Sequence, residues 1–402
     1  MSAADAKIPM IDLAAQHAPL EEELLEGLAA VLASGRFVLG EVVERFEAEL
    51  AALCEARFAV ACNSGTDALW IALRALGVGP GDRVLCPAYS FFATASTLVR
   101  LGAVPVFCDI LPGSLNLDPE DAIRRGEATP GLRAVVPVDL FGRACELGPL
   151  EAWCRARGVA IVDDAAQAIG TRDRQGGALG ARGRAACLSF YPTKNLGALG
   201  DAGALLTDDE GMAATARRLR SHGEAEPGVF REIGLNSRMD ALQAVALGLK
   251  LRHLEDWTRA RRRLALHYDA LFAERGARPS PLPFDGEGLP LRTPEPCPEP
   301  GRHTYHRYVI RVPAERRASL IGRLEAEGIA CEIYYRLGLH QQPALAGYFP
   351  ATSTGSEGAA ARAPLVETER ATRETLALPL FPEMRLEQVE RVVGVVARAL
   401  RD

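Results

Sequence analysis

The chain has 402 residues, of which 48% are hydrophobic and 24% are charged, values that allow a large buried core and a second, smaller unit. The formal net charge is -6, and acidic and basic residues alternate, so no basic field would attract nucleic acid or an anionic membrane surface. No basic stretch with an apolar core opens the chain, and no run of about 18 apolar residues follows. We therefore expect a cytoplasmic protein without nucleic-acid or membrane partners.

Apolar runs typical of buried strands alternate with amphipathic helical stretches along the first half. The strands are expected at residues 58–62, 84–86, 104–108, 134–138, 160–162 and 202–206, and helices at 68–76 and 147–157, among others. This rhythm indicates an α/β fold, with a mainly parallel central sheet covered by helices on both faces. Ligands of such sheets bind beyond the carboxyl ends of the strands, so the residues after each strand are of most interest.

The second half has a different pattern of predicted helices and strands, which indicates a smaller α+β unit. Residues 241–271 predict a long helix or a helix pair, and a loop rich in proline and glycine follows at 280–301. A strand at 308–312 and helices at 314–327 and 388–400 complete the pattern. We assign residues 1–250 to a large domain and 251–402 to a small C-terminal domain, with the N-terminal segment a candidate to pack on the small domain.

The nine cysteines are scattered along the chain, and no two form a C-x-x-C pair. An odd, dispersed set of this kind is typical of small apolar side chains in a reducing compartment. We expect most of them to be buried, and we expect no metal site.

A first candidate ligand site is the segment that follows the strand at 58–62 and opens a helix. The amides of a helix N-terminus are unpaired and favour an anion, Gly65 lets that anion approach closely, and Ser64 and Thr66 add hydroxyl groups. The segment predicts a phosphate site, although by itself it also fits a helix cap without a ligand.

A second candidate is the acidic pair Asp163 and Asp164 at the end of the strand predicted at 160–162. An ionised carboxylate in a dry setting needs a cation or strong donors, which indicates that one of the two meets a positive group of a ligand. Successive side chains of a strand point to opposite faces, so only one can do so. A capping aspartate beside a solvated one is the alternative.

A third candidate is Lys194, in the segment 189–197, where small, aromatic and glycine residues surround it and Pro192 stiffens the loop. A lysine enclosed in this way can lose its proton and act as a nucleophilic amine. Taken alone, the segment also fits an exposed loop lysine.

Together the three segments require a ligand that carries a phosphate, a cationic ring nitrogen and an aldehyde, and pyridoxal 5′-phosphate (PLP) has all three. Its protonated ring, held by a carboxylate, drains the negative charge that forms when an amino acid loses its α-proton. Lys194 would then bind the aldehyde and move the proton.

At this point the chain resembles the DegT/DnrJ/EryC1/StrS family of sugar aminotransferases, within the fold-type-I PLP enzymes. The resemblance covers nearly the whole length and rests on the segments 35–40, 64–69, 164–167, 189–195, 234–243 and 339–344. It implies the architecture expected above, with the mainly parallel sheet between helices and a smaller C-terminal domain.

The resemblance also implies a role for each matching residue. Lys194 corresponds to the catalytic Schiff-base lysine, Asp164 to the partner of the ring nitrogen and Gln167 to the neighbour of the ring hydroxyl. The remaining cofactor contacts are the phosphate-binding residues Ser64, Gly65, Thr66 and Ser189, a ring stacked on the cofactor (Phe91, or equally Phe92), and Asn236. Asn236 matches a residue that reaches the phosphate of the neighbouring subunit, which implies a homodimer with shared active sites.

The implied reaction takes an amino group from a donor, with L-glutamate favoured by the resemblance, through pyridoxamine 5′-phosphate to a keto carbon of a nucleotide-linked sugar. The C3 carbon of a dTDP- or UDP-deoxysugar is the leading candidate for that carbon. Arg36, Arg238 and His340 are candidate contacts for the donor carboxylate or the sugar phosphates, with surface salt bridges as the alternative.

Three alternatives to this reaction remain open. The acceptor could be a keto-cyclitol, or the chain could be a PLP- or pyridoxamine-phosphate-dependent sugar dehydratase, although in the related dehydratases a histidine replaces the lysine. The third alternative is a catalytically silent regulatory protein that keeps the fold.

Overall fold

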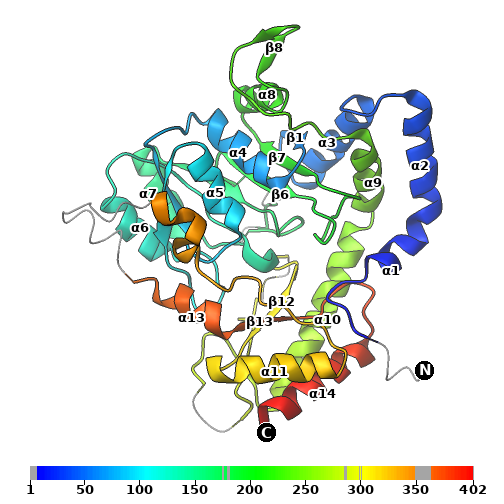
Figure 1. Ribbon diagram of the computed structural model, residues 1–402, viewed down its shortest axis with the longest axis vertical. Helices are drawn as coiled ribbons and strands as arrows, with labels where there is room; N and C mark the ends of the chain where they lie inside the picture. The colour runs from blue at the N-terminus through cyan, green and yellow to red at the C-terminus, as the bar shows by residue number, and fades with distance from the viewer. Residues whose placement is uncertain are drawn as a thin grey trace.

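The computed structural model describes residues 7–173, 176–178, 182–284, 288–297, 299, 301–348 and 364–401. At its centre is a seven-stranded sheet with the order β1-β7-β6-β5-β4-β2-β3 (Figure 1). Its strands are β1 (Phe58–Cys62), β2 (Arg83–Pro87), β3 (Val104–Cys108), β4 (Leu132–Val135), β5 (Ala160–Asp164), β6 (Ala185–Ser189) and β7 (Gly203–Thr207). All neighbouring strands are parallel except β7, which is antiparallel to β1 and β6. The predicted α/β class with a mainly parallel sheet is confirmed.

Helices cover both faces of this sheet because the side chains of each strand alternate between two apolar layers. In β1, Val60 joins one buried cluster and Ala59 and Ala61 join another. The first layer contains α4 (Gly65–Ala75), α5 (Phe92–Arg100) and α8 (Glu210–Leu219). The opposite layer contains α3 (Glu41–Leu53), α6 (Pro119–Glu127), α7 (Gly148–Arg157) and α9 (Ala241–Leu251).

Two strand predictions need correction. The strand β6 lies in none of the predicted ranges, because its five residues are mostly small and a loop precedes them, so the strand signal is weak. The strand predicted at 134–138 ends at Val135, and Pro137, which lacks an N–H donor, follows two residues later. The end of each other predicted strand lies within two residues of the observed one.

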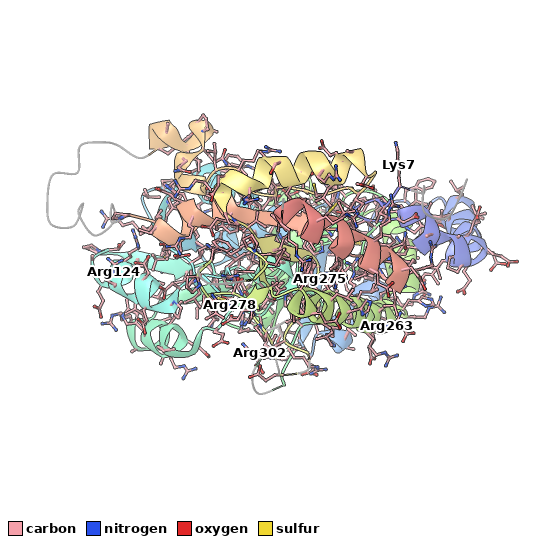
Figure 2. All side chains as sticks on the ribbon, turned by 90° about the horizontal axis from the view of Figure 1, so that it is seen from below. Lys7, Arg124, Arg263, Arg275, Arg278 and Arg302 are labelled. Atoms are coloured by element: carbon pink, nitrogen blue, oxygen red, sulfur yellow. The ribbon has the colours of Figure 1, made fainter. Side chains whose placement is uncertain are left out.

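The second half of the chain forms a smaller α+β unit around a second sheet with the order β10-β11-β12-β13. The predicted pair at 241–271 is α9 followed by α10 (Leu254–Glu274). The other elements are β10 (Arg278–Pro279), β11 (Arg292–Thr293), β12 (Tyr308–Arg311), β13 (Thr375–Leu378), α11 (Ala314–Ala326), α13 (Val366–Glu374) and α14 (Leu386–Arg401). The helices α11 and α14 lie side by side on the small sheet, as both figures show (Figure 2).

The chain passes between the two units along α10. Leu254, at its beginning, belongs to a core cluster of the large unit, whereas Leu264 and Phe272 belong to that of the small unit. The boundary placed at residue 250 remains a prediction, and it falls next to the short break between α9 and α10. Near the N-terminus, Ile8 bridges to Ile329 and is buried in the cluster of the small unit, while the adjacent Lys7 points outward (Figure 2).

The remaining elements are mostly short. They are α1 (Leu13–His17), η2 (Ala18–Leu20), α2 (Glu21–Ser34), η3 (Leu140–Gly142), β8 (Glu224–Glu226), β9 (Val229–Phe230), η5 (Leu339–Gln341) and η6 (Pro343–Tyr348). The β8–β9 hairpin projects from the large unit at the top of Figure 1. Seven of the nine cysteines are buried, and all are free thiols. Among the described helices none combines the length and the apolar character needed to cross a membrane.

Candidate active site

The three candidate segments meet at one edge of the large sheet. They follow the carboxyl ends of β1, β5 and β6, and β7 separates β1 from β6 in the sheet order. Because β7 is antiparallel, its first residue, Gly203, pairs with both Cys62 and Ser189 at this edge. A Cβ atom on Gly203 would lie 2.3 Å from the carbonyl carbon of Ser64, so the absence of a side chain lets the β1–α4 turn cross β7.

The turn between β1 and α4 forms a compact cradle against the end of β6. Ser64 caps α4, and its hydroxyl accepts a hydrogen bond from the amide of Asp67 at 3.1 Å. A Cβ atom on Gly65 would lie only 2.6 Å from the Cβ atom of Ser189, so this close approach requires glycine. The first-turn amides of a helix and two serine hydroxyls therefore converge, a donor set that fits a phosphate group.

The two acids at the end of β5 point in opposite directions, as predicted. Asp163 forms an ion pair with Arg182 at 2.6 Å, which holds it in the fold. Asp164 is 8% exposed and accepts a hydrogen bond from the Thr94 hydroxyl at 2.9 Å. Burial raises the pKa of Asp164, and the bond from Thr94 partly offsets that effect. Asp164 is thus the acid of the pair available to a ligand cation.

Lys194 lies on a tight turn after β6, with its amide bonded to the carbonyl of Tyr191 at 2.8 Å. The residue is partly buried, not exposed. Burial and the nearby positive charge of Arg307 lower the pKa of its amine to about 7, while Asp164 acts in the opposite direction. An amine with this pKa is about half neutral at pH 7, and the neutral form is the one a nucleophilic lysine needs.

The neighbouring Asn195 fixes this turn against the small unit. Its side-chain amide donates to the carbonyl of Thr304 at 3.2 Å, and its carbonyl oxygen lies 3.1 Å from Nδ1 of His306. Residues of the small unit are thereby held beside Lys194.

The structure distinguishes the two phenylalanines considered as ring-stacking residues. Phe92 is partly buried and packs against the core cluster beneath α5. Phe91, at the N-cap of the same helix, is 60% exposed. This exposure leaves the Phe91 ring available to a flat ligand, and Phe91 remains the predicted stacking residue.

Gln167 lies between the large unit and an aromatic cluster of the small unit. Its carbonyl oxygen accepts from the amide of Phe141 at 2.8 Å, and its amide nitrogen donates to the hydroxyl of Tyr335 at 3.1 Å. The side chain is therefore fixed in place three residues after Asp164.

The residues predicted for substrate contacts are placed further out. The stretch at 37–39 pairs with 239–241, which brings the exposed Arg36 and the partly buried Arg238 onto neighbouring segments. Arg238 donates to the side-chain oxygen of Asn236 at 3.1 Å, and Asn236 is exposed. His340 lies beside Glu369 at 3.7 Å and the ring of Phe107.

The sequence analysis gave no role to Thr94, which donates a hydrogen bond to Asp164, or to Arg307, whose positive charge acts on Lys194. The signal for Thr94 is weak, because a buried threonine within a helix is ordinary. Arg307 had a stronger signal, since a charged residue directly precedes an apolar strand that is buried at every position.

The DegT/DnrJ/EryC1/StrS aminotransferase family matches residues 19–397 of this chain. The chain belongs to this family. It is accordingly a PLP-dependent sugar aminotransferase, and the residues described above fit that cofactor: the cradle at Gly65 has the donors for its phosphate, Asp164 the carboxylate for its ring nitrogen, and Lys194 the amine for its aldehyde.

Three relatives have similar lengths and span almost all of the chain. The "Pleiotropic regulatory protein" of Geobacillus stearothermophilus is 39% identical over 98% of this chain and 99% of its own. The dTDP-3-amino-3,4,6-trideoxy-alpha-D-glucose transaminase of Streptomyces venezuelae is 39% identical over 97% and 95%. The UDP-N-acetyl-3-dehydro-alpha-D-glucosamine 3-aminotransferase of Acidithiobacillus ferrooxidans is 38% identical over 98% of both chains.

Solved structures of family members have the same fold. S. venezuelae DesV is 36% identical, with a TM-score of 0.87 over 98% of this chain and 99% of that chain. The Bacillus subtilis protein NtdA, solved with bound PMP (pyridoxamine 5′-phosphate), is 31% identical, with a TM-score of 0.82 over 98% of this chain and 86% of that chain.

Proposed function

We propose that this sugar aminotransferase transfers the amino group of L-glutamate to the C3 keto carbon of a nucleotide-linked deoxysugar in the cytoplasm. The observation that carries the proposal is the amine of Lys194, whose pKa burial and Arg307 lower to about 7. A base with this pKa can take the α-proton of the donor in one half-reaction and deliver a proton to the acceptor carbon in the other at neutral pH. A histidine at this position would have favoured the dehydratase.

The other site residues bind and orient. Bound PLP supplies an aldehyde for the donor nitrogen and an electron-accepting ring. Asp164, held by Thr94, presents a carboxylate that keeps the ring nitrogen protonated, and Gln167 is fixed beside it. Ser64, Gly65, Thr66 and Ser189 would hold the phosphate, and Phe91 would stack on the ring.

We further propose a homodimer in which each active site takes Asn236 from the other subunit. Asn236 is exposed on its own chain and lies close to strongly exposed apolar side chains, among them Ile233 at 86% and Phe230 at 59%. A second copy of the chain would bury these groups and bring Asn236 to its phosphate. Arg36 and Arg238, which lie on neighbouring segments, would then reach the sugar phosphates.

A mixing experiment tests the shared site. Lys194→Ala and Asn236→Ala homodimers should each be inactive or impaired, and a mixture after subunit exchange should recover up to about a quarter of wild-type activity. The recovery is expected because half of the subunits would be in hybrid dimers, each with one site free of both substitutions. No recovery despite verified exchange by native mass spectrometry would contradict the shared site.

The substrate proposal is tested with a panel of acceptors. The enzyme is incubated with glutamate and one acceptor at a time: a dTDP- or UDP-linked 3-keto sugar, a dTDP- or UDP-linked 4-keto sugar, or a free keto-cyclitol. The aminated product is identified by mass spectrometry and NMR. A C3-amino nucleotide sugar is the expected product. Amination of scyllo-inosose alone would favour the cyclitol alternative, and no spectral change of the cofactor with glutamate would favour a silent regulatory protein.

A further inference from the structure

Arg307 is a buried cation close to the catalytic lysine, on the segment that leads into β12. Its residue is 6% exposed, and its charge is one of the causes that lower the pKa of Lys194. Its Nη2 atom lies 3.5 Å from the hydroxyl of Thr193, the residue directly before Lys194. The guanidinium group is therefore directed toward the turn that carries the reactive amine.

The protein provides hydrogen-bond acceptors for only some of the N–H groups of Arg307. Nε donates to the hydroxyl of Tyr334, and Nη1 donates to the carbonyl of His306 at 2.9 Å. A guanidinium group has five N–H donors, so after these bonds and the long contact to Thr193 two N–H groups remain. The ring of Tyr334 covers one side of the group, with its centroid 5.2 Å from the Cζ atom.

Within the part of the chain that the structure describes, no carboxylate forms an ion pair with Arg307. Two other buried arginines have such partners, since Arg220 pairs with Glu47 and Arg302 with Glu146, whereas the buried Arg261 donates to main-chain carbonyls instead. Two other cationic side chains, Lys194 and Arg261, lie near Arg307, whereas burial lowers the pKa of the neighbouring His306 and favours its neutral form; the acid that acts on Arg307 electrostatically, Glu332, is exposed.

A buried guanidinium without a counter-charge is costly, and an arriving anion removes much of that cost. The cofactor phosphate is assigned to a different place, the cradle at Gly65 and Ser189. The amino donor brings a second anion, because an amino acid carries a carboxylate on the carbon from which Lys194 takes the proton. A guanidinium fork matches a carboxylate in two parallel hydrogen bonds.

We propose that Arg307 is the carboxylate-binding residue of this active site and holds the α-carboxylate of the amino donor. The inference rests on the proposed transamination with an amino-acid donor. It places donor recognition on the small unit beside the lysine turn, instead of on Arg36, Arg238 or His340. Arg307 would thereby orient the donor carbon so that its single α-hydrogen faces Nζ of Lys194.

The test uses the cofactor-loaded enzyme without any sugar, so it does not depend on the acceptor. The ligand 2-methylglutamate keeps both carboxylates but has no α-hydrogen to lose, and its dissociation constant is measured by isothermal titration calorimetry. Arg307→Gln should weaken its binding by about 30-fold or more, the effect of removing one partner of a buried charged pair. Arg307→Lys, which keeps the charge but not the fork, should weaken it less.

Two controls separate recognition from damage to the fold. Arg302→Gln removes a buried arginine that Glu146 already neutralises, so binding of 2-methylglutamate should stay within about twofold of wild type. The second control is 4-aminobutyrate, which is glutamate without its α-carboxylate, and its dissociation constant should change much less on Arg307→Gln than that of 2-methylglutamate. Cofactor absorbance and Tm establish that each variant is folded and loaded.

A further experiment establishes whether the carboxylate that Arg307 binds belongs to the amino donor or to the sugar acceptor. Enzyme loaded with pyridoxamine 5′-phosphate is given keto sugars with and without a carboxylate. If Arg307→Gln binds 2-methylglutamate normally but loses only carboxylate-bearing sugars, Arg307 binds a carboxylate of the acceptor, and the donor assignment is overturned. Normal behaviour in both arms overturns the whole inference. Failure of wild type to aminate any sugar would refute the proposed acceptor and leave the donor arm intact.

Discussion

The close approach of Gly65 to Ser189 predicts that a larger residue at position 65 weakens cofactor binding. In Gly65→Ala the added methyl group would lie 2.6 Å from the Cβ atom of Ser189, whereas ordinary contact begins at 3.4 Å. The two atoms must therefore separate by the difference, 3.4 - 2.6 = 0.8 Å. The backbone angles at Gly65 suit alanine, because the residue is helical and has no positive φ. The effect of the substitution is thus limited to this contact.

A displacement of that size should mainly weaken phosphate binding. Charge-assisted hydrogen bonds of about 2.8 Å would stretch to about 3.6 Å, which is beyond bonding distance. One lost bond to a charged group is worth about 1.5–3 kcal/mol, so the dissociation constant of PLP should rise about 10- to 100-fold. The overpacked contact should also lower the free energy of unfolding of the cofactor-free protein by about 1–3 kcal/mol.

The assay is a titration of the cofactor-free protein with PLP, followed by the absorbance of the bound cofactor, with thermal unfolding in parallel. Gly322→Ala in α11 is the matched control, because its Cβ atom would meet no atom within 4 Å. It should leave the dissociation constant unchanged and stabilise the helix by about 0.5–1 kcal/mol. If Gly65→Ala bound PLP as tightly as wild type, the β1–α4 turn would not be the phosphate cradle.

Two further predictions concern Asp164 and Lys194. Thr94→Val removes the hydrogen bond to Asp164, so it should raise the pKa of that carboxyl further and lower kcat about tenfold. The control is Thr97→Val, which removes a buried hydroxyl that has no partner among the described residues. This control variant should leave kcat unchanged. Equal kcat values for the two variants would argue against a role for Thr94. In the cofactor-free protein, acylation of Lys194 followed by peptide mass spectrometry should rise with pH through about 7, because the neutral amine reacts, and Arg307→Gln should move that midpoint upward by removing a positive charge. A Lys194 midpoint near that of an ordinary exposed lysine would contradict the desolvated site.

The local pattern of the sequence was enough to predict the chemistry of the site. Apolar runs followed by Ser64-Gly65-Thr66, by Asp164 and by Lys194 predicted strands with polar residues at their carboxyl ends, and the structure brings these ends together. Alternation along a strand also predicted that Asp163 and Asp164 point apart. These features are local, because they depend on the period of a strand and on the properties of a helix N-terminus.

Other features were decided by the tertiary structure alone. The position of β7 between β1 and β6, the support of Asp164 by Thr94, and the placement of Arg307 beside Lys194 all join residues far apart in the chain. No local pattern specifies such pairs, since they arise when segments far apart in the chain pack together and a charge loses its water. The sequence by itself predicted Lys194, Asp164 and the segment at Gly65 as groups of the site, and packing decided which groups are desolvated and face one another, and so how strongly the pKa of each is perturbed.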